Sequence, residues 1–496
     1  MANKVTVNLK MYRLNELGDC FLLTFKKGTK TSTMLVDFGS FRNSKASATR
    51  LNQIADDILK QHKNRMIDVV IGSHQHNDHI NGFFHAQNKF KNNIDRVWLS
   101  WLDDPKNQEA TRLQKSQLEL KQTMLSIKDG LSKLKTSGDV KDKDKIIDEM
   151  IEAYGDEKSV TPEMAMNILK DIGKKNPKYL TPGQIHELPQ FTKDEIKIYV
   201  LGPPVSRMAL RDLTPNEDES YDKHLMSNFL ASKRLLGAIE SRIANKNQDR
   251  EEAEFPFNAD YKIPISVANE CLEHYKQLQH GIKVDLSEEM KILEDPIAFG
   301  KMIVNYKSKP NEVIDDIWLD QIDRLSLYMD SFTNNSSLAI AIELVETGKV
   351  LLFPADAQTG NWNSWFDVKY QKSKTTTEDL MRNTIIYKVG HHGSHNATLV
   401  RALELMEHKD LVALIPVHKN DSNIKKPTNP WKMPATNLLA RLKEKTKNRV
   451  LRMDDVFEKD CNPRNSRAAK KSWSELNYTK LPDATNKLFI EMEFEG

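Results

Sequence analysis

The chain has 496 residues, 39% of them hydrophobic and 29% charged, and its 73 basic and 70 acidic side chains give a net charge of +3. This composition excludes an intrinsically disordered or fibrous protein, and the length favours either one enlarged domain with insertions or about two to three domains. Because the charge is nearly balanced, any nucleic-acid-binding surface would have to be local.

The cysteines and the N-terminal segment bear on the cellular compartment. Cys20, Cys271 and Cys461 are far apart, so they form neither a disulfide framework nor a CxxC metal motif, and we expect a reducing compartment. The first residues alternate like a strand and lack the apolar core of a signal peptide, and no apolar run reaches the roughly 18 residues of a membrane-spanning helix. These features favour a cytoplasmic protein that does not enter the membrane.

Residues 1–106 contain the short β-branched or alternating runs that are typical of strands. The predicted strands are Val5–Leu14, Cys20–Phe25, Met34–Asp37, Ile67–Gly72 and Arg96–Trp101. Between the third and the fourth of them, apolar residues at helical spacing predict a helix over Ala46–Gln61. The order strand, helix, strand is typical of an α/β domain.

Two long segments of different character interrupt this pattern. Residues 107–190 are rich in helix formers of mixed charge and are predicted to be a helical insertion. Residues 205–330 have a similar pattern and are predicted to be a second insertion. Residues 191–204, which lie between the insertions, contain one predicted strand, Ile196–Leu201.

Strand patterns return in residues 331–496. The elements predicted there are a helix over Ala435–Lys445 and strands over Ser337–Leu344, Val350–Phe353, Thr384–Val389, Leu411–Val417 and Lys487–Phe494. Because the strand-rich parts flank the insertions, we expect them to pack together as one αββα sandwich that carries two long, mostly helical insertions.

A cluster of histidines follows one of the most apolar predicted strands. The sequence SHQHNDHINGF begins at Ser73, directly after Ile67–Gly72, so its polar residues are predicted to lie in the loop at the carboxyl end of a buried strand. Ligands commonly bind there in α/β sheets. Imidazoles and a carboxylate suit Zn²⁺, Mn²⁺ or Fe, and the alternate positions His74 and His76 can converge on one ion. The alternative explanation is an ordinary polar turn at the surface.

A second histidine cluster has the same context. The sequence KVGHHGSHNAT ends a later strand and contains His391, His392, Ser394 and His395. Between the two clusters, Asp356 follows the strand Val350–Phe353, and its carboxylate could bridge two metal ions there. An aspartate at a strand end is also common in turns, so Asp356 indicates little by itself.

The pattern SHxHxDHxxG, followed far downstream by a strand with Asp356 and by HHGS, resembles the metallo-β-lactamase superfamily, and within it the C-terminal domain of ComEC-type competence proteins. The resemblance extends to LVDFG around Asp37 and covers residues 1–101, 190–205 and 330–496. It implies an αββα metallo-β-lactamase sandwich with two divalent metal ions, Zn or Mn, in the cleft between the sheets.

The resemblance also implies a role for each motif residue. The implied metal ligands are His74 and His76 for one ion, Asp78, His79 and His392 for the other, and Asp356 as the bridge between them. His391 and Ser394 would contact the substrate phosphate, and Asp78 would in addition orient the attacking water. Asp37 would hold a ligand histidine in its metal-binding tautomer. His391 is the alternative to His392 as the ligand.

The sequence departs from the family pattern at two places. Gly202, in VLGPP, stands where many relatives have a histidine, and Met433-Pro434 stands where ComEC-type domains often have His-Pro. One metal site is therefore expected to be open or weakly bound. His395 and His418 are candidates for the missing ligand, although an ordinary loop position is the better explanation of both.

The predicted function follows from the resemblance. It is a metal-dependent hydrolase, and we predict a phosphodiesterase or nuclease that acts on DNA through water activated by two metal ions. Basic stretches at Lys233–Arg234, Arg441–Arg452 and Arg464–Lys471 could attract DNA, but an ordinary solvated face explains them better, because aromatic residues are not interleaved among them.

Two other functions are consistent with the sequence. The same metals hydrolyse a small-molecule ester, lactone, thioester or phosphodiester elsewhere in the superfamily. A regulatory or binding module with a degenerate metal site is the third hypothesis, and the retained histidine motifs argue against it. The helical insertions would shape substrate access or dock a protein partner.

Overall fold

The fold was examined in a computed structural model. It describes residues 4–62, 65–115, 117–118, 122, 160–211, 265–281, 296–308, 331–396, 398–427, 430–454, 467–474, 476, 478–483 and 486–496. The chain divides into two compact units. The first comprises Met1–Leu120, Asp148–Met226 and Met329–Gly496, and the second comprises Lys121–Ile147 and Ser227–Tyr328.

Within the described residues, the first unit contains two β-sheets. The larger sheet has eight strands in the spatial order β14 (Tyr478–Asp483), β15 (Phe489–Glu495), β1 (Thr6–Tyr12), β2 (Cys20–Lys27), β3 (Lys30–Phe38), β4 (Ile67–Ile71), β5 (Ile94–Ser100) and β6 (Lys178–Leu180). Its strands are antiparallel from β14 to β3 and parallel from β3 to β6.

The second sheet has seven strands and a similar change of direction. Their order is β13 (Val450–Arg452), β12 (Val412–Ile415), β11 (Thr384–Lys388), β10 (Lys349–Phe353), β9 (Ile340–Leu344), β8 (Ile196–Val200) and β7 (Ile185–His186). The strands from β10 to β13 are parallel, and those from β7 to β10 are antiparallel. The mixed α/β class with two sheets is therefore confirmed.

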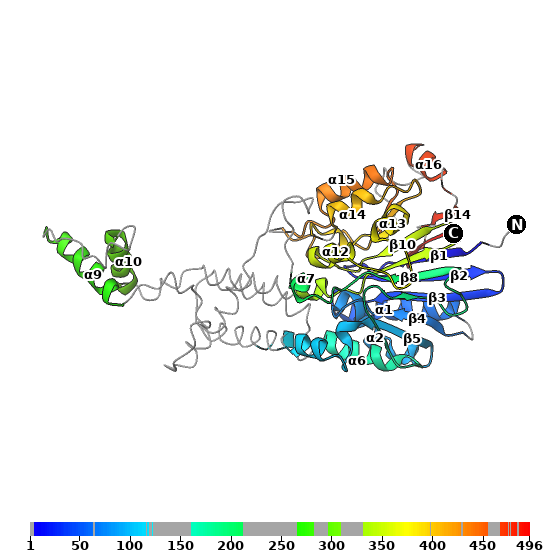
Figure 1. The fold of residues 1–496 in the computed structure, drawn as a ribbon, viewed down its shortest axis with the longest axis horizontal. Helices are drawn as coiled ribbons and strands as arrows, with labels where there is room; N and C mark the ends of the chain where they lie inside the picture. Colours follow the sequence, from blue (N-terminus) through cyan, green and yellow to red (C-terminus); the bar gives the residue numbers. More distant parts are fainter. Residues whose placement is uncertain are drawn as a thin grey trace. The chain divides into compact units, whose positions relative to one another are not determined.

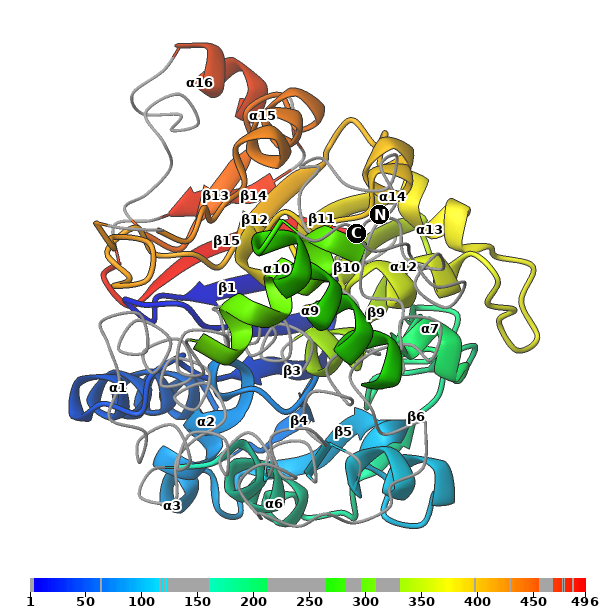
Figure 2. The same cartoon turned by 90° about the vertical axis from the view of Figure 1, so that its left-hand side faces the viewer.

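The helices of the first unit lie on the outer sides of the two sheets (Figures 1 and 2). Those beside the larger sheet are α1 (Lys45–Gln61), α2 (Asn77–His85), α3 (Gln87–Phe90) and α6 (Pro162–Ile172). Those beside the second sheet are α12 (Thr359–Trp365), α13 (Thr377–Arg382), α14 (Val400–Leu405) and α15 (Thr436–Lys445). Other short helices of this unit include η1 (Trp101–Asp103), α7 (Arg207–Arg211), η5 (His391–Gly393) and α16 (Arg467–Ser474).

Apolar side chains fill the space between the sheets. The ring of Phe21 on β2 meets the ring of Phe353 on β10 edge to face, with centroids 5.7 Å apart. The central parallel strands are almost entirely buried, as in β4, IDVVI, and β11, TIIYK. Strands that are covered on both faces have continuous apolar runs, which explains why these two were recognisable in the sequence.

Helix α1 illustrates how the local sequence defines an element. The Ser44 side chain accepts a hydrogen bond from the Ser47 amide at the helix N-terminus, a cap that contributes about 1 kcal/mol. Leu51, Ile54 and Ile58 are fully buried at helical spacing and face the sheet side of the helix. This arrangement agrees with the helix predicted over residues 46–61.

Short strands were missed where the sequence predicts a helical insertion. Residues 107–190 contain β6 and β7, which extend one sheet each, so the predicted boundary at residue 190 is wrong. Strands of three and two residues are too short to produce a periodic pattern. Residues 123–159 of this segment lie outside the described residues.

The described part of the second unit is a pair of helices, α9 (Ile265–Gln279) and α10 (Pro296–Ser308). They pack closely at Gly300, because a Cβ atom there would lie only 2.3 Å from the carbonyl oxygen of Cys271. Together with α7, these helices agree with the helical character predicted for residues 205–330. No described helix has the length and apolar character needed to cross a membrane.

Candidate metal centre

The motif residues meet where parallel strands of both sheets end. Strand β3 carries Asp37 next to its last residue, and β4 is followed by the segment Ser73–His79. On the other sheet, β10 is followed by Asp356, and β11 is followed by His391 and His392. Because each sheet contributes two neighbouring carboxyl ends, polar groups from distant parts of the sequence converge between them.

The first histidine motif is only partly a loop. His74 and His76 precede helix α2, with His76 at the cap position, but Asp78 and His79 stand in its first turn. The prediction that all of these residues lie in a loop is therefore wrong. Gly39 allows the close approach, since a Cβ atom there would lie 2.3 Å from the carbonyl oxygen of Asn77.

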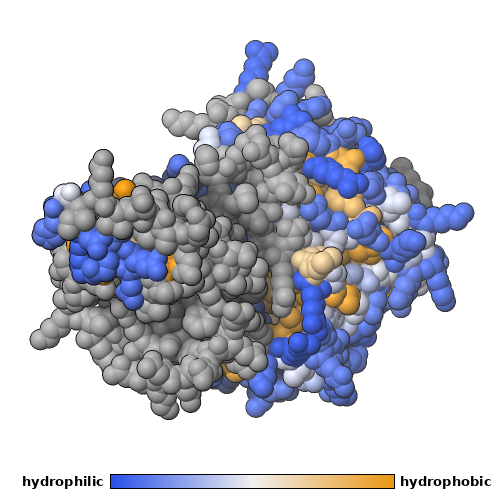
Figure 3. Space-filling view, turned by 60° about the vertical axis from the view of Figure 1, so that its left-hand side comes forward, coloured by the Kyte–Doolittle hydropathy of each residue, from blue (hydrophilic) through white to orange (hydrophobic). Residues whose placement is uncertain are grey.

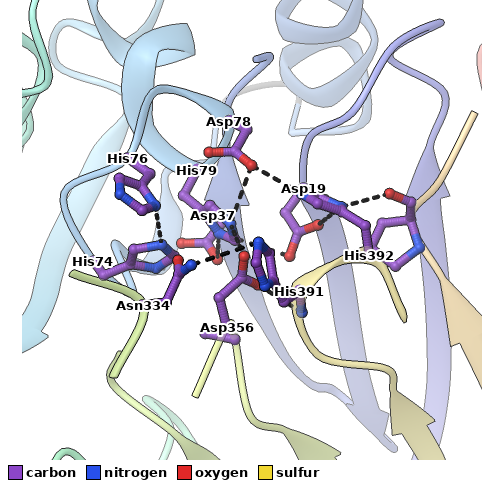
Figure 4. Close-up of polar contacts among 12 residues, drawn as sticks. Asp19, Asp37, His74, His76, Asp78, His79, Asn334, Asp356, His391 and His392 are labelled. Atoms are coloured by element: carbon purple, nitrogen blue, oxygen red, sulfur yellow. Dashed lines mark hydrogen bonds and ion pairs between the residues drawn. The ribbon is translucent and has the colours of Figure 1, made fainter. Parts of the chain in front are cut away.

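Four motif residues form a buried cluster, which we call the four-residue cluster: Asp78, His79, Asp356 and His392. Each offers one ligand atom, and these atoms all lie within 4.8 Å of one another (Figure 4). His392 Nε2 lies 2.8 Å from Asp78 Oδ2, and His79 Nε2 lies 3.2 Å from Asp356 Oδ2. This group of side chains could hold a metal ion.

Two atoms of the four-residue cluster are compatible with a bound ion. His79 Nε2 and Asp356 Oδ2 are buried and lie 3.2 Å apart as an ion pair, and neither makes a well-aligned hydrogen bond. Buried polar atoms are rarely left in this state, because the lost hydration costs free energy. Ligand atoms that share one tetrahedral ion lie about 3.3 Å apart, since each metal–ligand bond is about 2.0–2.1 Å long. The separations of 2.8, 3.2 and 3.8 Å in the cluster lie on both sides of this value.

Asp37 fixes the orientation of His79. Asp37 accepts hydrogen bonds from the Ser73 amide and hydroxyl, each at 2.8 Å, and from His79 Nδ1 at 2.8 Å. This places the Nδ1 proton of His79 toward Asp37 and turns Nε2 toward the four-residue cluster. Asp37 thus contacts the ring nitrogen of His79 that faces away from the four-residue cluster.

His74 and His76 form a pair beside the cluster. His74 Nε2 and His76 Nδ1 are 3.1 Å apart, and the His74 ring lies 4.1 Å from the His79 ring between centroids. The hydroxyl of Ser337 lies 3.2 Å from His74 Nδ1. Two imidazole nitrogens at this separation could share an ion, but within the described residues they belong to no group of three or more candidate ligands.

His391 and Ser394 lie at the edge of the cluster and contact each other. Ser394 Oγ is 2.9 Å from His391 Nδ1 and donates to Asn396 Oδ1 at 2.8 Å, so His391 Nδ1 donates to the serine oxygen. His391 Nε2 then accepts from the Asn334 amide at 3.5 Å. His392, and not His391, contributes a ligand atom to the four-residue cluster.

Sequence reasoning missed two buried charges, Asp19 and Lys388. The Lys388 ammonium lies 2.5 Å from Asp19 Oδ2 and 3.1 Å from Asp356 Oδ1, and both residues are 1% exposed. Lys388 also donates to the carbonyl oxygen of Ala355 at 2.9 Å. The signal in the sequence was a single lysine at the end of the otherwise apolar strand TIIYK.

Asp19, Asp37 and His79 form a second group of candidate metal ligands. His79 Nδ1 in this group already donates to Asp37, and the Lys388 ammonium already neutralises Asp19. A cavity of about 10 Å³ lies beside these carboxylates, which is room for about one water molecule. We therefore place the candidate ion in the four-residue cluster.

The pKa values of the cluster reflect this dense arrangement of charges. Burial lowers the pKa of His79, but Asp356, Asp78, Asp19 and Asp37 outweigh that effect and raise it well above 6.5. For His392, burial likewise lowers the pKa, while the hydrogen bond to Asp78 raises it above 6.5 overall. By contrast, burial and the neighbouring His79 and His76 hold the pKa of His74 well below its usual value.

Asp356 and Lys388 keep their charges in this environment. Burial raises the pKa of Asp356, but His79 and Lys388 bring it well below 3.8. Burial lowers the pKa of Lys388, but Asp19 and Asp356 raise it above 10.5 overall. The site therefore combines ionised carboxylates with a fixed ammonium and two histidines that hold their protons strongly.

Gly202 cannot be replaced by a histidine in this structure. A Cβ atom at Gly202 would lie 1.9 Å from Asn361 Oδ1, and the Asn361 amide donates to the carbonyl oxygens of Asn335 and Ser337 at 2.9 Å. Among the described groups of candidate metal ligands, neither His395 nor His418 appears.

Comparison with known proteins gave no relative: no protein-family model and no curated protein sequence matches this chain.

Proposed function

We propose that the protein is a metal-dependent hydrolase with a metallo-β-lactamase type of αββα sandwich, and that it cleaves phosphodiester bonds. The observation that carries this proposal is the four-residue cluster, in which buried Asp and His side chains from both sheets come within 4.8 Å of one another. Perturbed titratable groups that converge at strand ends are the usual mark of a functional site in an α/β protein.

Asp78, His79, Asp356 and His392 would hold one divalent ion, Zn or Mn, and His74 with His76 would hold a second. When bound, such ions lower the pKa of water and neutralise the charge of a phosphate. Charge balance supports the first ion. His79 and His392 both have raised pKa values, so a divalent ion that replaces their two protons leaves the net charge of the buried cluster unchanged.

The residues of the chain contribute orientation and charge. Asp37 fixes the tautomer of His79 through the 2.8 Å contact with its Nδ1. Asp356 Oδ1 accepts from Lys388 at 3.1 Å and from the His391 amide at 3.0 Å, which leaves Oδ2 as the oxygen available to an ion. Asp78 would orient the attacking water, and the half-buried imidazole of His391, once protonated, would contact a phosphate oxygen.

DNA is the substrate that we propose, because two adjacent ion sites suit the displacement at a phosphodiester. Two groups beside Asp356 belong to the same site. The buried Lys388 ammonium offsets the charges of Asp19 and Asp356, and His391 stands at the edge of the site with its Nε2 turned to Asn334. On the face drawn in Figure 3, the described residues are mostly hydrophilic, with small separate groups of apolar side chains.

The experiment measures bound metal and hydrolysis in the same preparations. Metal content would be determined by mass spectrometry for the wild type, Asp356→Asn and His392→Ala, with the exposed His280→Ala as a matched control. Each preparation would then be given plasmid DNA, bis-p-nitrophenyl phosphate and a panel of carboxylic esters. We expect bound metal and phosphodiester cleavage in the wild type and the control, and the loss of both in the two cluster variants.

Other results would change the proposal. If the wild type binds metal but cleaves only esters, lactones or thioesters, the protein is a small-molecule hydrolase. If the wild type binds no metal and the cluster variants behave like it in every assay, the metal-dependent hydrolase is rejected in favour of a regulatory or binding module.

A further inference from the structure

Two aromatic and two cationic side chains from two distant segments of the chain form a row. The rings of Phe41 and Trp431 meet edge to face with centroids 5.6 Å apart. The Arg42 guanidinium lies 5.7 Å from the Phe41 centroid, and the Lys426 ammonium lies 5.7 Å from the Trp431 ring. These distances are within the range of cation–π attraction. We call Arg42, Phe41, Trp431 and Lys426 the aromatic row.

The loop that carries Trp431 is attached to the candidate metal centre at both of its ends. At its start, the carbonyl oxygen of Pro416 accepts a hydrogen bond from His392 Nδ1 at 2.7 Å. At its end, the Ala435 amide donates to the carbonyl oxygen of Gly393 at 2.8 Å. Residues 416 and 435, at the two ends of this loop, are therefore bound directly to the turn that presents His392.

Internal contacts hold the row in place. The Trp431 amide donates to the carbonyl oxygen of Asn423 at 2.9 Å. Asp421, which is buried, lies 3.3 Å from the Arg42 guanidinium and accepts a hydrogen bond from the Leu17 amide at 3.2 Å. The loop is thus tied to the segment around Phe41, which follows β3 and lies beside the start of α2.

The charge of this loop is strongly positive. Residues 417–435 contain four lysines and a single acidic residue, Asp421, whose charge is paired with Arg42. Lys419, Lys425 and Lys432 are exposed, and Lys426 is half-exposed next to Trp431. Trp431 is itself half-exposed. A cationic surface with an accessible aromatic ring is complementary to a polyanion that carries flat, stacking groups.

We propose that the aromatic row and the lysines of residues 417–435 bind a single-stranded nucleic acid and lead it to the candidate metal centre. A base stacks on Trp431, and the neighbouring phosphates contact Lys425, Lys426 and Lys432. Single strands fit this surface better than a duplex, because the bases of a duplex are already stacked on one another. This inference deepens the proposed function. It rests on the proposed function for one step, the cleavage of the bound strand.

The test measures binding separately from cleavage. Fluorescein-labelled oligothymidylate would be titrated with the full chain as purified, and its anisotropy recorded, with a gel to check that the probe is intact. The variants are Trp431→Ala, Trp431→Phe and Lys425→Ala with Lys432→Ala. The matched control is Lys470→Ala with Lys471→Ala, which removes two exposed lysines from α16.

We expect Trp431→Ala to weaken binding by about 10-fold or more, because one stacked base contributes that much affinity. Trp431→Phe should retain most of the affinity, since a phenyl ring also stacks. The double lysine variant should reduce the slope of log Kd against log salt by about 1.4, at about 0.7 for each lost phosphate contact with a single strand. The α16 control should bind like the wild type.

Several results would overturn the inference. Equal binding by wild type and Trp431→Ala would exclude stacking on Trp431, and tighter binding to a duplex of the same length would exclude the single strand. A wild type that hydrolyses bis-p-nitrophenyl phosphate but does not bind the oligonucleotide would remove the inference and leave the proposed function intact. If the protein binds the oligonucleotide through Trp431 but hydrolyses no substrate, the binding surface stands and the proposed function is rejected.

Discussion

Asp78 and His392 are 314 positions apart in the sequence, and their side chains meet with 2.8 Å between Oδ2 and Nε2. Asp78 stands in the first turn of α2, and His392 follows β11, so this contact joins the ends of the two sheets. The Nδ1 atom of His392 is held by the carbonyl oxygen of Pro416 at 2.7 Å. His392 therefore presents only its Nε2 to the four-residue cluster, where a proton and a metal ion compete for the same atom.

This competition predicts how metal affinity depends on pH. The pKa values of His79 and His392 are raised above 6.5, so without metal both rings keep their protons above that pH, and an ion must displace them. We expect metal affinity to increase as the pH rises from 6.5 through these raised values, with release of protons on binding. Calorimetric titration in two buffers of different ionisation enthalpy measures that release. Affinity that does not change with pH would contradict the prediction.

The stability of the metal-free chain should have the opposite pH dependence. A histidine whose pKa is raised by folding stabilises the native state fully below its unfolded value near 6.5. That contribution is lost as the pH rises through the raised folded-state value. We therefore expect the unfolding temperature of metal-free protein to fall with rising pH above 6.5, relative to metal-loaded protein, as measured by calorimetry. If the unfolding temperatures of metal-free and metal-loaded protein change with pH in parallel, His79 and His392 do not titrate as described.

Lys388→Met should destabilise the fold. The substitution leaves Asp19 and Asp356 buried without their cation, and the loss of one partner of a buried ion pair costs about 3–5 kcal/mol. Urea unfolding of metal-free protein measures the change in the free energy of unfolding. Lys197→Met is the matched control, because Lys197 is partly exposed and 3.9 Å from Glu343, and surface pairs contribute about 0–1 kcal/mol.

A second variant distinguishes charge from packing at this position. Asp19→Asn combined with Lys388→Met removes one of the unpaired carboxylates, so the double variant should lose less stability than the sum of the single variants. Strictly additive losses would mean that the ammonium of Lys388 does not act through Asp19.

His74→Ala should separate the two proposed ion positions. His74 and His76 face each other at 3.1 Å but belong to no larger group of candidate ligands, whereas the four-residue cluster does not depend on either of them. We expect His74→Ala to keep the more tightly bound ion and to lose a weaker one, and Asp356→Asn to lose the tighter ion. Metal titration followed by calorimetry measures both events. Complete loss of metal in His74→Ala would show that the two positions are not independent.

Gly202→Ala should be destabilising although it adds only a methyl group. The new Cβ atom would lie 1.9 Å from Asn361 Oδ1, which also accepts a hydrogen bond from Trp365 Nε1 at 2.7 Å. Overpacking of this kind costs about 1–3 kcal/mol. Thermal unfolding measures the effect, and an unchanged unfolding temperature would mean that Asn361 moves aside at no cost.

Apolar runs in the sequence were sufficient to predict the strands that are buried on both faces. The apolar runs of β4 and β11 identified both strands, and the residues that follow each strand were recognised as candidate metal ligands. Such runs can be recognised in a sequence because nearly every position of a central parallel strand is apolar. The mixed α/β class was likewise predictable from the order of strands and helices, whereas the two-residue strand β7 was too short to leave a pattern.

Only the tertiary structure decided which distant groups meet. His391 and His392 are neighbours of the same type, and the backbone turn after β11 directs only His392 toward Asp78. In the sequence, Lys388 is only a single charge in an apolar strand. The structure places its ammonium 2.5 Å from Asp19 Oδ2. The sequence by itself indicated the longer strands and the candidate ligand residues, because these depend on residues near one another in the chain. The partners of Lys388 and His392 depend on how two sheets pack, and long-range packing leaves no trace in local periodicity.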